Sequence, residues 1–184
     1  MIQSGDPTTS KALFHELFDP SDIQQLQDAF SAAVGVASVI TDPQGVPLTQ
    51  PSGFCTLCNT IRSTQAGHEN CLRSDAIIGS PNPLGPQIQT CFSGGLLDGG
   101  ASIMVDDIHV ANWLIGQVML PDADENAMMA YAETIGAEPV AYREALKQVP
   151  RMSAERFSQV CDFLFINAQM LSGYARKNRQ LTYE

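Results

Sequence analysis

Apolar residues recur at helical spacing near the start of the chain. Ile23, Leu26 and Phe30 lie three or four positions apart, between a capping residue at Asp19 and a helix stop at Gly35. A side chain that caps the first turn and a glycine that follows the last turn are common limits of a helix. The pattern therefore predicts a helix between Asp19 and Gly35.

Apolar runs of the kind found in strands follow this helix. Val36–Thr41 and Val46–Thr49 flank Asp-Pro-Gln-Gly, which predicts a hairpin. Further strands are expected at Ile88–Phe92, Ser102–Val105 and Val110–Leu120, with Asp106-Asp107 as a hairpin link between the last two. The last run is apolar on both faces, so we expect a central strand that is covered on each side.

The stretches between these runs predict short helices and turns. Helices are expected at 59–66 and 69–78, separated at Gly67. The pairs Gly94-Gly95 and Gly99-Gly100 lack the helix and lysine of a phosphate-binding loop, so we expect them to form turns between strands.

The last third of the chain has a helical pattern. Helices are expected at Glu125–Ile135 and Val140–Val149, and a last helix begins after Pro150 with Ser153 as its cap. Apolar residues of this last helix repeat at alternating spacings of four and three, at Phe157, Cys161, Leu164, Ala168, Leu171 and Ala175. The repeat is typical of a coiled-coil seam and of a homodimer through this helix, but a helix packed on its own domain produces it too.

The order of the elements favours an α+β fold with a mainly antiparallel sheet flanked by helices and a long C-terminal helix. We expect a flexible segment at 1–12, one folded domain at 13–175, and the start of a connector helix to a following output domain at 176–184. A chain of 184 residues with 44% hydrophobic residues is long enough for one such domain.

Charge and hydropathy argue against several partners. A net charge of −10 disfavours a surface for nucleic acid or anionic lipid, which needs clustered lysine and arginine. No apolar run approaches the roughly 18 residues needed to span a bilayer. The first residues also lack a basic start followed by an apolar run, so we expect a cytoplasmic protein.

Four cysteines fall within one short window, at Cys55, Cys58, Cys71 and Cys91. In a reducing compartment such a group indicates metal binding, redox chemistry or simple burial. Two cysteines separated by two residues at a turn form half of a tetrathiolate site. We therefore expect zinc at these four residues, with an iron–sulfur cluster as the less favoured metal group.

Two alternatives to a structural metal site stay open. A cysteine- or zinc-dependent hydrolase would need a carboxylate base, for which Asp75 and Asp98 are the suggestive candidates, or a pairing of Cys58 with His68 or His109. A redox switch would instead open and close a disulfide between cysteines of the cluster.

Polar residues interrupt the apolar run of the last expected strand. Strict alternation places Trp113 and Gln117 on one face together with His109, and Asn112 on the other. Polar groups in a covered strand either bond to the backbone or face a ligand pocket. This strand is therefore the first candidate for a binding surface.

Long strings of the sequence resemble the PocR sensory domain family. They are Phe14-x2-Leu17-Phe18-Asp19, GVASVITDPQGVPLTQPSGFCTLC, Cys71-x2-Ser74-Asp75, CFSGGLLDGGASI and HVANWLIGQV, and they cover about residues 13–175. The resemblance implies a bacterial, cytoplasmic domain of PAS-like fold ahead of a histidine kinase, PAS, diguanylate cyclase or DNA-binding region. It also implies sensing of small hydrocarbon derivatives such as propanediol or glycerol, without catalysis by this domain.

On this resemblance we expect a small-molecule pocket on the sheet. Its apolar walls would come from Phe54 and Trp113, and its hydrogen bonds from Ser93, His109, Asn112 and Gln117. The cysteine cluster would hold the loop at 50–58 over the sheet, and ligand binding would bias the last helix.

Overall fold

An antiparallel sheet with the strand order β1-β4-β3-β2 forms the centre of the fold. The computed structural model describes the backbone of residues 7–182 and the side chains of residues 10–180. The strands in this part of the chain are β1 (Ala37–Thr41), β2 (Gln87–Thr90), β3 (Leu97–Val105) and β4 (Ile108–Val118). The helices are α1 (Pro7–Leu17), α2 (Pro20–Val34), α3 (Thr56–Arg62), α4 (Gln65–Ile78), α5 (Glu125–Thr134), α6 (Pro139–Lys147) and α7 (Ala154–Thr182). The predicted α+β class, with an antiparallel sheet flanked by helices and a long C-terminal helix, is confirmed.

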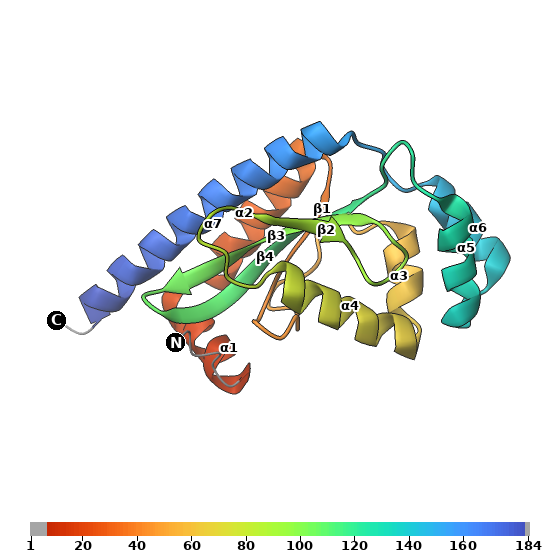
Figure 1. The fold of residues 1–184 in the computed structure, drawn as a ribbon. Coiled ribbons are helices and arrows are strands. Elements are labelled where there is room, and N and C mark those ends of the chain that lie inside the picture. Colours follow the sequence, from red (N-terminus) through yellow and green to blue (C-terminus); the bar gives the residue numbers. More distant parts are fainter. Residues whose placement is uncertain (1–6, 183–184) are drawn as a thin grey trace.

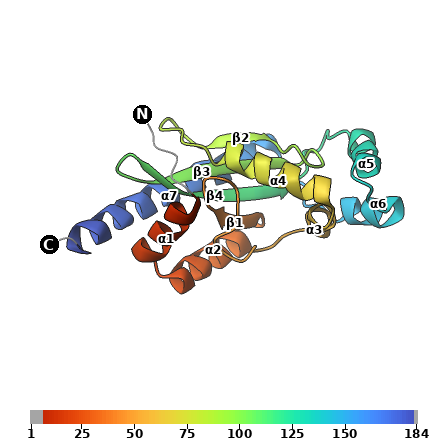
Figure 2. The same ribbon diagram turned by 90° about the horizontal axis from the view of Figure 1, so that it is seen from below.

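Helices cover both faces of the sheet. The long helix α7 and helix α2 lie over one face, and α4 lies over the other, as Figure 1 shows. The view from below shows α4 running along the sheet, with α3, α5 and α6 grouped beyond one end of it (Figure 2). Residues 7–12 of the segment expected to be flexible belong to α1, and residues 1–6 lie outside the described residues.

The larger hydrophobic core fills the space between the sheet and helices α1, α2 and α7. All six residues of the predicted coiled-coil seam are buried in this core: Phe157, Cys161, Leu164, Ala168, Leu171 and Ala175. The seam therefore packs on its own domain. A homodimer through α7 remains a prediction, and it would have to use the opposite side of the helix, where Phe163, Ile166, Met170 and Tyr174 are each more than half exposed.

One predicted turn and one predicted strand differ from the structure, whereas Gly94 and Gly95 lie in a turn as expected. Gly99 and Gly100 lie inside β3 and do not form a turn. Glycine is required at position 99 because a side chain there would overlap Cys161 of α7. A side chain on Gly100 would come within 2.6 Å of the carbonyl oxygen of Ile78, so α4 lies equally close on the other face. The predicted strand at 46–49 is reduced to a bridge between Thr41 and Pro47, since proline has no N–H to donate.

The predicted break between the two short helices is also displaced. Helix α3 ends at Arg62, and Thr64 caps α4 by accepting a hydrogen bond from the Gly67 N–H at 3.1 Å. Gly67 is therefore in the first turn of α4 rather than between helices. The sequence signal missed here was Thr64, which has the side-chain oxygen that a cap requires.

Strict alternation fails at both ends of β4, where a bulge interrupts the pairing with β3. Near its start, Ile103 pairs with Ala111 but Met104 pairs with His109, which leaves Val110 as an extra residue. His109 consequently lies on the same face as Asn112, and the Nε2 atom of His109 is 2.6 Å from the Asn112 Oδ1 atom. The predicted grouping of His109 with Trp113 is therefore wrong, since one extra residue reverses the side-chain direction.

Candidate functional site

A small cavity lies between α4, the loop that precedes α3, and the face of the sheet that α4 covers. The space between its lining atoms is about 310 Å³, including the part open to solvent. It is lined by Ala37, Ser38, Val39, Phe54, Arg62, Asp75, Ile78, Asp98, Leu114, Ile115, Gly116 and Gln117. The space that the centre of a water molecule can reach is about 30 Å³, far below the roughly 300–1,000 Å³ of common ligand pockets, so only a ligand of a few atoms fits.

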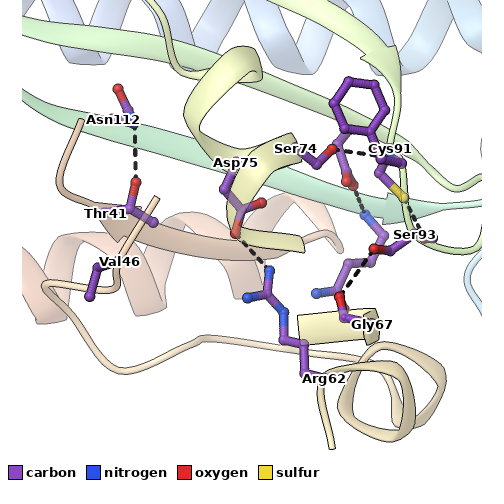
Figure 3. Close-up of polar contacts among 12 residues, drawn as sticks. Thr41, Val46, Arg62, Gly67, Ser74, Asp75, Cys91, Ser93 and Asn112 are labelled. Carbon is purple, nitrogen blue, oxygen red and sulfur yellow. Dashed lines mark hydrogen bonds and ion pairs between the residues drawn. The ribbon is translucent and has the colours of Figure 1, made fainter. Parts of the chain in front are cut away.

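An ion pair between two helices forms the polar wall of the cavity. The Arg62 guanidinium from the end of α3 donates to an Asp75 carboxylate oxygen on α4 at 2.8 Å (Figure 3). The two side chains keep only 19% and 10% of their surface exposed, so the pair is largely shielded from water. The Phe54 ring lies 5.3 Å from the centre of the guanidinium group and covers it.

One donor of this arginine is left over. The Arg62 Nε atom is buried and has no hydrogen-bond partner among the residues that the structure describes. Buried N–H groups nearly always have a partner, and each exception needs an explanation. The unpartnered donor belongs to a side chain that lines the cavity.

The loop that carries Phe54 is fixed to α2 through a buried glutamine. The Gln27 amide donates to the carbonyl oxygen of Gln50 at 2.8 Å and to the Ser52 hydroxyl at 2.6 Å. The Thr49 hydroxyl in turn donates to the Gln27 Oε1 atom. These contacts hold the loop at 49–53 beside β1 and thereby place Phe54 over the cavity.

A second bulge brings Asp98 and Gln117 to the other side of the cavity. Leu97 pairs with Val118 and Gly99 with Ile115, so Asp98 alone lies opposite two residues of β4. The Gln117 N–H donates to the Asp98 Oδ1 atom at 2.8 Å, and Gln117 has a positive φ of 60°. A residue other than glycine held at positive φ stores roughly 1–3 kcal/mol of strain, and such residues gather at functional sites.

Burial disfavours the charged form of both carboxyl groups in the cavity. Burial raises the pKa of Asp98 to about 7, against the opposing effect of the hydrogen bond from Gln117. Burial also raises the pKa of Asp75, although the adjacent Arg62 lowers it. Close to neutral pH the cavity therefore holds one paired carboxylate and one carboxyl group that is partly protonated.

The four clustered cysteines lie in a second hydrophobic core, next to the cavity. Cys58 and Cys71 are buried members of this core, and Cys55 and Cys91 pack against it with more exposure. The Cys55 and Cys58 side chains are hydrogen-bonded to each other, and this bond lowers the pKa of Cys55 to about 7. The thiol of Cys91 donates to the carbonyl oxygen of Ser93 at 2.7 Å.

The cysteine cluster does not have the arrangement of a metal centre. Across residues 10–180, no three cysteine, histidine or acidic side chains are placed so that they could hold one metal ion. The thiolate chemistry of the donor set suits zinc, but four sulfur atoms must converge on one point for a tetrahedral site. Zinc and an iron–sulfur cluster at these cysteines stay untested predictions, and no step below depends on them.

Most of the chain matches one known protein family. The sequence model of the sensory domain found in PocR matches residues 16–175. The chain belongs to the PocR sensory domain family. No curated protein and no solved structure matches the chain. In the described part of the PocR domain, no helix is both long and apolar enough to cross a membrane.

The structure brings two of the six predicted ligand residues of the PocR domain to the cavity. Phe54 and Gln117 line it from the loop and from the end of β4. Gln117 reaches this position only through the bulge opposite Asp98, so its predicted grouping with Trp113 does not hold at this end of the strand. The side chain of Gln117 also accepts the Cys55 N–H at 2.8 Å, which ties the cysteine loop to the cavity.

The other four predicted residues do not line this cavity. Trp113 lies in the larger core on the opposite face, where its indole N–H donates to the Ser38 hydroxyl at 2.9 Å. Asn112, in the middle of β4, donates to Thr41, apart from the Arg62–Asp75 pair (Figure 3). Ser93 is buried beside α4 and donates to the carbonyl oxygen of Gly67 at 3.3 Å. His109 bonds to Asn112 as described above.

Arg62 is the residue of the cavity that sequence reasoning missed. Asp75 and Asp98 were suggestive only as bases for a hydrolase, and the structure places both in the wall of the cavity. No sequence signal singled out Arg62, because an arginine in the last turn of a short helix normally lies at the surface. Its partner Asp75 could not be assigned from spacing alone, since the two residues belong to different helices.

The raised pKa of Asp98 predicts a pH dependence of stability. A carboxyl group whose pKa rises on folding from 3.8 to about 7 takes up a proton when the PocR domain folds. The free energy of unfolding should therefore fall as the pH rises across about 4 to 7, by up to about 1 kcal/mol per pH unit. Urea unfolding at a series of pH values measures this slope.

The Asp98→Asn variant isolates this contribution. Asparagine keeps the oxygen that accepts the Gln117 N–H but cannot titrate, whereas Asp75, Arg62, Cys58 and Cys91 remain around it. The unfolding free energy of the native chain should therefore fall as the pH rises from about 4 to 7, and that of Asp98→Asn should lack this fall. Parallel pH profiles for both proteins would contradict the prediction.

Proposed function

We propose that this PocR domain senses a small hydrocarbon derivative with hydroxyl groups, which binds in the cavity beneath Phe54. The observation that carries the proposal is the buried Arg62 N–H that lacks an acceptor in the described part of the chain. A buried donor without a partner costs about 1–3 kcal/mol. A ligand oxygen that accepts this hydrogen bond would recover that free energy on binding.

The remaining chemistry of the cavity supports a diol or glycerol. Arg62 supplies a donor, and the carboxyl oxygens of Asp75 and Asp98 supply acceptors on two sides. Val39 and Leu114 form an apolar floor on the sheet between them. A short hydrocarbon with neighbouring hydroxyl groups matches this alternation of polar and apolar walls. Few atoms make contact, so a modest affinity is expected.

The domain's place in a larger system belongs to the same proposal. We infer a sensor that acts in the cytoplasm, where thiols stay reduced, and that passes its state to an output region through α7. A homodimer through the exposed side of α7 would fit this arrangement and stays a prediction. No reaction is proposed for the domain.

Thermal unfolding in the presence of glycerol, propanediol and short hydroxy acids tests the ligand site. A compound that binds should raise the unfolding free energy by about 2.7 kcal/mol when present at about 100 times its Kd. For a domain of this size that gain corresponds to a rise of roughly 5–10 °C in Tm. Titration calorimetry then gives the Kd of the best compound.

Replacement of Arg62 with lysine separates binding from folding. Lysine keeps the positive charge beside Asp75 but has no equivalent of the Nε–H, so we expect about tenfold weaker binding with the fold retained. Arg73→Lys is the matched control, because Arg73 lies over Phe92 outside the cavity. Equal affinities of the two variants, or no thermal shift with any of these compounds, would overturn the proposal.

A further inference from the structure

Two neighbouring thiols lie at the edge of the cavity and differ in accessibility. Cys55 is the residue before the first turn of α3, and Cys58 lies within that turn. The Cys55 thiol is partly exposed, whereas Cys58 is buried. They are three residues apart at the start of a helix, a spacing that makes two side chains neighbours, and both thiols are free.

The exposed surface of Cys55 opens into a groove separate from the cavity. This groove runs between the end of α2 and the loop at 51–55, and its empty space, open to solvent, is about 960 Å³. Cys55 and Gln117 both line it. The empty space of the groove is about three times that of the cavity. A disulfide the size of a short peptide can therefore reach Cys55 through the groove, although it is too large for the cavity.

The other cysteines are less suited to react. Cys71 is buried in the second core, and Cys161 is buried in the larger core under α7. The Cys91 thiol is engaged by the Ser93 carbonyl oxygen at 2.7 Å. None of these three lines the groove. Cys55 is therefore the accessible thiol, and Cys58 is the one placed to resolve an adduct on it.

We propose that Cys55 and Cys58 form a site of reversible thiol–disulfide exchange with low-molecular-weight disulfides, which reach Cys55 through the groove. The Cys55 thiolate attacks one sulfur of the disulfide, the mixed disulfide forms, and one thiolate leaves and takes up a proton. Cys58 then loses its proton and attacks the Cys55 sulfur, which releases the second thiol. The two cysteines lose two electrons and two protons, and the incoming disulfide is reduced to two thiols.

The exchange changes the wall of the ligand cavity. A disulfide fixes the two Cβ atoms about 3.5–4.5 Å apart. Because Cys55 precedes the helix and Cys58 lies within it, we expect Cys55 to make the movement that the bond requires. The Cys55 N–H donates to Gln117 at 2.8 Å, and Gln117 donates to Asp98, so this movement disturbs the contacts of both cavity residues. This effect rests on the proposed ligand site, whereas the exchange itself does not.

Glutathione disulfide is the probe for the exchange. The reduced full chain is incubated with mixtures of glutathione and its disulfide, and intact mass and peptide mapping then locate the products. We expect one disulfide between Cys55 and Cys58, and in Cys58→Ser a stable adduct of one glutathionyl group on Cys55. Cys161→Ser is the control and should react as the native chain does.

The outcomes separate the exchange from the ligand site. Free Cys55 under excess glutathione disulfide, a disulfide at other positions, or stoichiometric zinc that protects both thiols would overturn the exchange. The Kd for propanediol or glycerol, measured on both redox forms, should change at least threefold on oxidation. An unchanged Kd overturns the coupling alone. Absence of binding in both forms overturns the proposed function, and the mapped disulfide still decides the exchange.

Discussion

Replacement of Arg62 with methionine is expected to lower the free energy of unfolding by about 3 kcal/mol and to abolish ligand binding. The variant leaves the Asp75 carboxylate in a shielded site without the guanidinium that it bonds to at 2.8 Å. Loss of one partner of a buried ion pair costs roughly 3–5 kcal/mol, and some remaining exposure of both side chains places this pair at the lower end. Urea unfolding monitored by circular dichroism measures the change.

A double-mutant cycle with Asp75→Asn tests the cause of this loss. If the unpaired carboxylate is responsible, the double variant should be no less stable than Arg62→Met alone. Lys147→Met is the control, because Lys147 pairs with Glu144 on the surface and should lose less than about 0.5 kcal/mol. Additive losses in the cycle would show that the ion pair does not stabilise the site as argued.

Replacement of Gly116 with alanine is expected to lower the free energy of unfolding by about 2–4 kcal/mol. The added Cβ would overlap the Asp98 carboxylate, and Gly116 has a φ of 152°, which disfavours any side chain. Overpacking and backbone strain each cost roughly 1–3 kcal/mol. Because Asp98 must move, the pH dependence of stability attributed to Asp98 should weaken in the same variant.

Gly173→Ala is the matched control for this substitution. Gly173 lies in α7, and a Cβ added there would have no atom within 4 Å. Alanine in a helix is favoured over glycine by about 0.5–1 kcal/mol, so this variant should be more stable than the native chain. Similar losses at both positions would mean that the contact with Asp98 is not what makes Gly116 necessary.

The sequence was sufficient for the elements that local signals define. Asp19 caps α2 as predicted, by accepting the Ser21 N–H at 2.8 Å, and the αL conformation of Gly35 ends the helix. Strand β4 was recognised as the covered central strand because its residues are apolar on both faces. Periodicity and capping act over a few residues, so they can be read without knowledge of the tertiary fold.

Features that depend on contacts between distant parts of the chain could not be predicted from local sequence patterns. A helix that packs on a partner helix and one that packs on its own sheet have the same apolar pattern. Only the tertiary structure shows that the seam of α7 packs within its own domain. Neither bulge in β4 was predicted, although Gly116 inside an apolar strand is a recognised bulge signal. The two bulges move His109 to the Asn112 face and bring Gln117 to Asp98. Four of the six predicted ligand residues lie on this strand and were assigned to its faces by that alternation: His109, Asn112, Trp113 and Gln117.

The adjacent glycines of β3 leave the sheet one backbone thick between the ligand cavity and the C-terminal helix. The carbonyl group of Ile78, at the end of α4, lies against Gly100 on one side, and Cys161 of α7 lies against Gly99 on the other. Neither contact has a side chain in between that could deform and absorb a small displacement. If a bound ligand displaces α4, that displacement is passed to α7 across a partition with no room to compress, and a larger residue at either position would force a helix off the sheet.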